Sequence, residues 1–163
     1  MMNNKVSVEK TRVMNLREYL IEIIDDLSEN KDYQINANML SNNPNNYSLD
    51  KIPVASTIER WIMGIEVHKD VYSFRSRMDY SQNTMDNLIN VGFFEKFEET
   101  ILSNNNKKKL PNIQGIESIE CLNCGSMNNA ESNTCEFDIQ LQIKYKVGGN
   151  NETDNSENWF YIT

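Results

Sequence analysis

The chain has 163 residues, of which 25% are charged, and a formal net charge of -8 at pH 7. This length suits one ordinary domain with a real hydrophobic core. The acidic balance argues against non-specific nucleic-acid binding, which requires clustered Lys and Arg side chains on phosphates. We expect no membrane association, because no run of about 18 apolar residues is present and residues 1–12 lack the apolar core of a secretory signal. We therefore expect the protein to stay in the cytoplasm where it is made.

The first elements in the chain are a predicted helix and a predicted strand. Apolar residues at spacings of three and four, from Leu16 to Leu27, predict a helix over residues 8–29. Alternating apolar and polar residues predict a strand over residues 33–40. Residues 41–53 are polar, rich in Asn and broken by Pro44 and Pro53, which predicts a long loop. Long ordered loops in a compact domain are often functional or interfacial.

The middle of the chain predicts two strands and a second helix. Residues 57–67 and 71–78 are rich in β-branched and aromatic side chains and predict two strands with a turn at residues 68–70; one long bent strand fits this segment as well. Helical spacing returns over residues 81–102, with Ser81 as the expected N-cap and Gly92 as a break between two helices. The expected apolar stripe of this region consists of Met85, Leu88, Ile89, Phe93, Phe97 and Ile101.

The clearest predicted element is the last strand, residues 135–147, in which apolar and polar residues alternate strictly. A shorter strand at residues 116–122 precedes it. Residues 148–163 are predicted to form a flexible acidic tail that carries Trp159, Phe160 and Tyr161 near its end. The element order predicts an α+β domain over residues 1–147, with an antiparallel or mixed sheet of about five strands and two main helices packed on one face.

All three cysteines lie in one window, with Cys121 and Cys124 as a Cys-x-x-Cys pair and Cys135 as a third thiol. Zinc needs four ligands, a number that the three cysteines and His68, the only histidine in the chain, could together supply. Against a zinc site, residues 121 and 124 of one strand point to opposite faces. A redox pair normally opens a helix, whereas the residues after Cys124 are typical of a turn. We therefore expect no metal, no cofactor and no enzyme; the alternative is a small thiol- or zinc-dependent binding or redox domain.

Other chemical signals in the sequence are weak. His68 has no identifiable nucleophile or carboxylate partner for acid-base catalysis. Arg75 and Arg77 share one face of a predicted strand, and Lys107, Lys108 and Lys109 form a basic run. No glycine-rich phosphate loop, paired-carboxylate signature or nucleophile elbow is present. These observations favour a protein that acts through its surfaces.

Two segments, residues 56–101 and 110–147, resemble the tail terminator (tail-completion or minor capsid) proteins of tailed phages and phage-tail-like bacteriocins from Gram-positive, Clostridium-like hosts. The most telling motifs are VYSFRSRM at residues 71–78 and CEFDIQLQIKYKV at residues 135–147. With the N-terminal helix, the resemblance covers about residues 8–147. It implies a small α+β protein that forms a six-membered ring on the head-proximal end of the tail tube.

The resemblance also implies a structural role in the neck of the virion, after assembly in the bacterial cytoplasm. Such a ring stops tube polymerisation, docks the head connector and, in a contractile tail, meets the last sheath ring. The implied partners are copies of the chain, the tube protein, the connector and the sheath protein, with no specific nucleic acid. A further alternative is a head-side connector or another tail protein. Our own candidates for contact residues are Asn43, Pro44, Tyr47, Arg75, Arg77, Lys107, Lys108, Lys109, Trp159, Phe160 and Tyr161.

Overall fold

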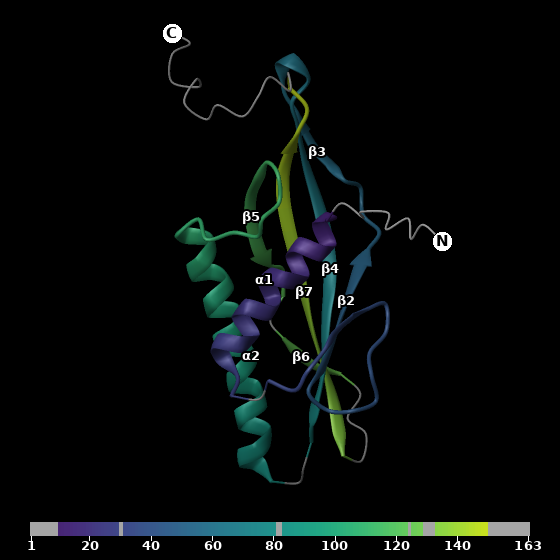
Figure 1. The fold of residues 1–163 in the computed structure, drawn as a ribbon, viewed down its shortest axis with the longest axis vertical. Coiled ribbons are helices and arrows are strands. Elements are labelled where there is room, and N and C mark those ends of the chain that lie inside the picture. The colour runs from purple at the N-terminus through teal and green to yellow at the C-terminus, as the bar shows by residue number, and fades with distance from the viewer. Residues whose placement is uncertain (1–9, 30, 81–82, 124, 129–132, 150–163) are drawn as a thin grey trace, which may run out of the picture.

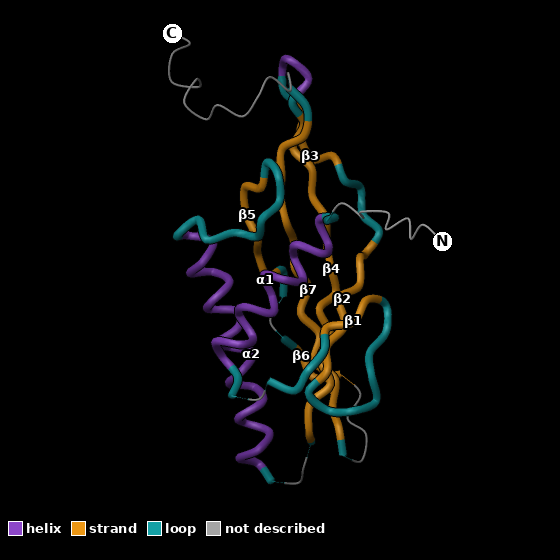
Figure 2. The backbone as a smooth tube through the Cα atoms, viewed as in Figure 1, coloured by secondary structure: helices purple, strands orange, loops and turns teal. Residues whose placement is uncertain are grey.

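The computed structural model describes residues 10–29, 31–80, 83–123, 125–128 and 133–149. It shows two α-helices against a mixed, seven-stranded sheet, which confirms the predicted α+β class (Figures 1 and 2). The strand order is β1-β2-β4-β7-β5, with β3 paired to β4 and β6 paired to β7. Because β2 and β3 pair with successive parts of β4, and β5 and β6 with successive parts of β7, the sheet is about five strands wide, as predicted.

The centre of the sheet is a pair of long antiparallel strands, β4 (Glu66–Asp79) and β7 (Thr134–Val147). They pair along their full length, from Glu66 opposite Val147 to Asp79 opposite Thr134. Fourteen residues at about 3.4 Å each make this pair about 48 Å long. The flanking strands are β1 (Ile35–Ala37), β2 (Asn46–Ile52), β3 (Thr57–Arg60), β5 (Ile116–Cys121) and β6 (Ser126–Asn128).

The hydrophobic core lies between the sheet and the helices α1 (Arg12–Leu27) and α2 (Thr84–Asn106). The buried stripe of α1 runs from Leu16 to Ile24, which confirms the predicted helix. Aromatic rings connect the layers: Phe74 of β4 stacks on Tyr47 of β2 and on Phe97 of α2, with 5.3 Å between ring centroids in both pairs. The alternation predicted for β7 is also confirmed, because its apolar residues from Phe137 to Tyr145 are buried.

Two predictions for the first half of the chain are wrong. The polar segment 41–53 contains the strand β2, which pairs with β4 from Asn46 opposite Arg77 to Ile52 opposite Val71. Residues 68–70 lie inside β4 and make no turn; the chain instead reverses between β3 and β4, at residues 61–65. Both errors arise because these strands contain polar side chains, which are typical of loops and turns in a sequence. In the fold, tertiary contacts satisfy those side chains.

The prediction for α2 is also wrong in two details. The helix is continuous through Gly92, and it begins after Asn83, whose side-chain oxygen accepts a hydrogen bond from the amide of Met85 at 3.0 Å. Ser81 lies outside the described residues. The buried residues of the helix begin near its middle, at Phe94, Phe97 and Ile101, and Phe93 packs partly against the core.

Candidate interaction surfaces

The turn between β3 and β4 carries the most exposed apolar residues of the described chain. A 3-10 turn at Ile62–Gly64 leaves Ile62 92% and Met63 83% exposed. The amide of Trp61 donates to the carbonyl of Ile65 at 2.7 Å, which closes the turn. We call Trp61, Ile62 and Met63 the hairpin tip; it lies at the top of Figure 1. Exposed apolar clusters of this kind mark contact sites for other proteins.

The hairpin tip is held in place by its neighbours. Trp61 Nε1 donates to Glu59 Oε2 at 2.9 Å, and Lys146 Nζ lies 4.5 Å from the centre of the Trp61 ring. Behind the turn, the backbone of Gly148 approaches so closely that a Cβ atom there would lie 2.2 Å from the carbonyl oxygen of Gly64. Gly148 also has a φ of +86°, which favours glycine. The apolar side chains are therefore presented by a defined backbone.

The second apolar surface lies at the other end of the molecule, on the first half of α2. Met85, Leu88 and Ile89 are 61%, 56% and 63% exposed, although the sequence predicts them as core. In Figure 1 this part of α2 runs beside the lower ends of the central strands β4 and β7, and its three apolar side chains remain exposed. Beside it lies a groove of about 270 Å³, which we call the α2 groove. Its lining consists of Tyr80, Thr84, Asn87, Leu88, Asn90, Val91, Met127, Cys135 and Phe137.

A buried carboxylate, Asp70, joins the start of α1 to the sheet. Its side chain is 2% exposed, and it pairs with Arg12 Nε at 2.8 Å and Lys51 Nζ at 3.4 Å. Tyr145 Oη also donates to it, at 3.2 Å. The Arg12 guanidinium in turn lies 4.5 Å from the centre of the Tyr145 ring, a favourable cation-aromatic geometry. The cluster thus connects α1, β2, β4 and β7.

The electrostatics of this cluster keep Asp70 charged. Burial raises the pKa of Asp70, but the hydrogen bond and positive charge of Arg12, followed by the charge of Lys51, outweigh burial and place that pKa below its ordinary value. Burial, together with the Asp70 charge, raises the pKa of Tyr72 and of Tyr145. Two cations and two phenols therefore surround one carboxylate, an arrangement that suits a structural tie between elements.

The two arginines predicted as contact residues are engaged within the fold. Arg75 pairs with Asp50 at 2.5 Å across the β4–β2 register. Arg77 is nearly buried: it pairs with Glu136 at 2.5 Å and donates from Nε to the carbonyl of Ser41 at 2.9 Å. Both lie on the same face of β4, as the sequence predicts from their spacing, and this face is opposite the one that carries the core residues Tyr72 and Phe74. Their contacts fix β2 and the segment before it to the central strands.

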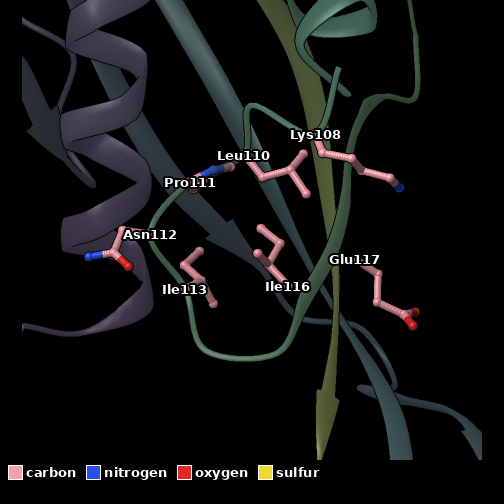
Figure 3. A pocket seen from close by; sticks show the side chains of 7 residues that line it. All are labelled: Lys108, Leu110, Pro111, Asn112, Ile113, Ile116 and Glu117. Carbon is pink, nitrogen blue, oxygen red and sulfur yellow. The ribbon is translucent and has the colours of Figure 1, made fainter. Parts of the chain in front are cut away.

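The basic run Lys107 to Lys109 is exposed where α2 ends. Lys108 has a φ of +59°, and the amide of Lys109 donates to the carbonyl of Asn104 at 2.9 Å, which closes the helix terminus. Next to it is an open hollow of about 610 Å³, in which Leu110 and two isoleucines form the floor while Lys108 and Glu117 point outward (Figure 3). Its complete lining is Lys108, Leu110, Pro111, Asn112, Ile113, Ile116 and Glu117. Positive charge at a helix C-terminus is favourable by itself, so the position of the lysines needs no bound partner to account for it.

The residues predicted as low-probability metal ligands do not converge. Cys121 lies opposite Leu141, and Cys135 lies opposite Met78. His68 lies ten residues from Met78 along β4, a separation of about 33 Å at 3.3 Å per residue. His68 Nε2 instead lies 2.7 Å from Glu66 Oε2. Cys124 is outside the described residues, and no group of three metal-ligating side chains occurs in the described part of the chain.

No protein-family model matches the chain. No curated protein matches it significantly either. Within the described residues, no helix is both long and apolar enough to cross a membrane.

The remaining predicted contact residues lie before β2, in the core, or outside the described residues. Asn43 is exposed and Pro44 is half-buried, both in the segment before β2, while Tyr47 is buried under the helices and offers a partner no surface. Trp159, Phe160 and Tyr161 lie outside the described residues.

The hairpin tip was missed because residues 57–67 look like one strand, although the polar pair Glu59 and Arg60 followed by an apolar run and a glycine is a usable turn signal.

Proposed function

We propose that this chain is a tail terminator: a structural protein that forms a ring on the head-proximal end of a phage or phage-like tail tube. The observation that carries the proposal is the pair of exposed apolar surfaces, the hairpin tip and the first half of α2, at opposite ends of a rigid strand pair. A subunit with two different contact surfaces can bind a partner at each end, as a ring protein between tube and connector must. The sequence resemblance to tail terminators supports the same role.

The charge of the chain agrees with this proposal. A ring around the channel through which DNA leaves the head must not hold the DNA, and a subunit with a formal net charge of -8 repels phosphates. On the described sheet face away from the core, Arg75 and Arg77 are neutralised by Asp50 and Glu136. The arginines of this face therefore offer little net positive charge to a nucleic acid.

The test is a tube-capping assay. Tail tube protein from the same particle is polymerised with and without the purified chain, and tube lengths are measured by negative-stain electron microscopy. We expect shorter tubes with a ring of extra density at one end. The variant Leu102→Asp, at an exposed α2 position outside both apolar surfaces, is the control and should cap normally.

Three results would contradict the proposal. Tubes of unchanged length would show that the chain does not terminate polymerisation. Long tubes formed by the chain alone would identify a tube protein. Binding to isolated heads, with none to tube ends, would identify a head-side connector.

A further inference from the structure

We infer that the hairpin tip of one copy inserts into the α2 groove of the next copy, so that copies associate head to tail. This inference names the self-contact of the ring proposed above and rests on that proposal only for the ring's biological role. Its evidence is the shape, chemistry and spacing of the two surfaces. A contact between two different patches is heterologous, and repeated copies close into a ring when the rotation between them allows closure.

The two surfaces cannot meet within one copy. The tip lies beyond the end of the strand pair at which Glu66 faces Val147, and the groove includes Cys135 and Phe137 near the other end. The twelve residue steps from Cys135 to Val147 span about 40 Å of continuous paired strand. Figure 1 shows the tip and the start of α2 at opposite ends of the molecule. Any tip that fills a groove must therefore come from another copy.

The size and chemistry of the groove fit a small number of apolar side chains. Its volume of about 270 Å³ lies below the range of roughly 300–1,000 Å³ that is usual for small-molecule sites. Leu88, Val91, Met127 and Phe137 contribute apolar surface, and none of its lining residues is charged. Ile62 and Met63 are uncharged as well, so insertion buries no unpaired ion, which would be costly.

The exposed area sets an upper limit on the contact. Trp61, Ile62 and Met63 on one copy, with the exposed α2 residues and Met127 on the other, present on the order of 1,000 Å² of surface, so the contact is at the small end of specific protein contacts. Each copy in a closed ring makes two such contacts. The hydrogen bond from Trp61 to Glu59 and the close approach of Gly148 hold the hairpin tip in place. Because its backbone is already ordered, less conformational entropy is lost on binding.

The experiment uses the full chain and two single variants, Ile62→Asp at the tip and Leu88→Asp at the groove. Each is studied alone and mixed one to one by sedimentation velocity, at a protein concentration of about 100 µM, which populates even weak contacts. Leu102→Asp is the matched control, because Leu102 and Leu88 are both α2 leucines with similar exposure, 62% and 56%. Circular dichroism confirms that all variants are folded.

We expect the unmodified chain and Leu102→Asp to form species larger than a dimer. Ile62→Asp and Leu88→Asp should each be monomeric, since one broken patch removes the contact. Their mixture should contain a heterodimer and nothing larger, because an intact groove on the first meets an intact tip on the second.

Four outcomes overturn the inference: a monomeric unmodified chain, an unchanged assembly state in either patch variant, loss of assembly in Leu102→Asp, or a mixture that stays monomeric. The last would show that both patches matter but do not bind each other. The tube-capping assay tests the terminator role separately. If the chain caps tubes but the sedimentation results contradict the tip-to-groove contact, this inference is wrong and the terminator role stands.

Discussion

Replacing Asp70 with Asn tests whether the buried carboxylate ties α1 to the sheet. The substitution keeps the shape of the side chain and removes its charge. In the folded chain it weakens the contacts to Arg12 at 2.8 Å, Lys51 at 3.4 Å and Tyr145 at 3.2 Å. We expect the free energy of unfolding to fall while the fold is retained.

The magnitude follows from the exposure of the partners. Breaking a fully buried ion pair costs about 3–5 kcal/mol, because one charge is left buried without a partner. Here the side chains of Arg12 and Lys51 are 44% and 55% exposed, so water can solvate the cations once the carboxylate charge is gone. A hydrogen bond to a charged group contributes about 1.5–3 kcal/mol. We therefore expect Asp70→Asn to lower the free energy of unfolding by about 2 kcal/mol at pH 7.

The pKa of Asp70 also predicts how the stability difference between the two proteins changes with pH. The pKa of Asp70 is lower in the folded chain than in the unfolded chain, so its contribution is present above the unfolded value, about 3.9, and is lost as the pH falls through the folded value. The difference between the unmodified chain and Asp70→Asn should be constant from about pH 7 to pH 5 and shrink below about pH 4. Urea denaturation followed by circular dichroism at each pH measures it.

Asp26→Asn is the control, because Asp26 is an exposed carboxylate on α1 and its loss should change the free energy by no more than about 0.5 kcal/mol. Two results would refute the reasoning. One is an Asp70→Asn variant as stable as the unmodified chain at pH 7. The other is a difference between the two proteins that grows as the pH falls from 5 to 3.

Three further substitutions test the backbone and the core by thermal and urea denaturation. Gly92→Ala should stabilise the chain by about 0.5–1 kcal/mol, since Gly92 lies inside α2 with open space around its Cβ position; a loss of stability would contradict the continuous helix. Gly148→Ala should destabilise the chain by about 1–2 kcal/mol, because a Cβ at φ +86° would lie 2.2 Å from the Gly64 carbonyl oxygen; a neutral result would count against this close approach of Gly148 to the hairpin turn. Ser76→Ala should be neutral or stabilising by up to about 1 kcal/mol, since the buried Ser76 Oγ has no hydrogen-bond partner in the described part of the chain; a loss above 1 kcal/mol would imply a partner.

The sequence predicts the elements whose faces are purely apolar or purely polar and fails where one face is mixed. Strand β7 alternates without exception, and its prediction is correct. Strand β2 does not look amphipathic, because Lys51 occupies a position on its core-side face. Lys51 pairs with Asp70, nineteen residues later in the chain. Because Asp70 is a charged residue, residues 68–70 look like a turn in the sequence. No local pattern reports a pairing of this kind.

The candidate surfaces were missed for a related reason. Helical spacing shows that Met85, Leu88 and Ile89 share an apolar side of α2, but spacing cannot show which part of that side the core covers. In the fold these three residues stay exposed, and the α2 groove lies beside them. Only the described fold separates the core residues Phe94 and Phe97 from the exposed ones.

The length of the β4–β7 pair prevents the two apolar surfaces of one copy from covering each other. A flexible connection would let the hairpin tip fold back and cover the first half of α2, which would give a closed monomer. The continuous ladder from Glu66 opposite Val147 to Asp79 opposite Thr134 holds the two surfaces about 40 Å apart and forbids that arrangement. The hairpin tip and the first half of α2 can then bury each other only between two copies. Because the two patches differ, burying both on copies of the same chain requires a repeating head-to-tail arrangement, and the rotation per copy decides whether it closes.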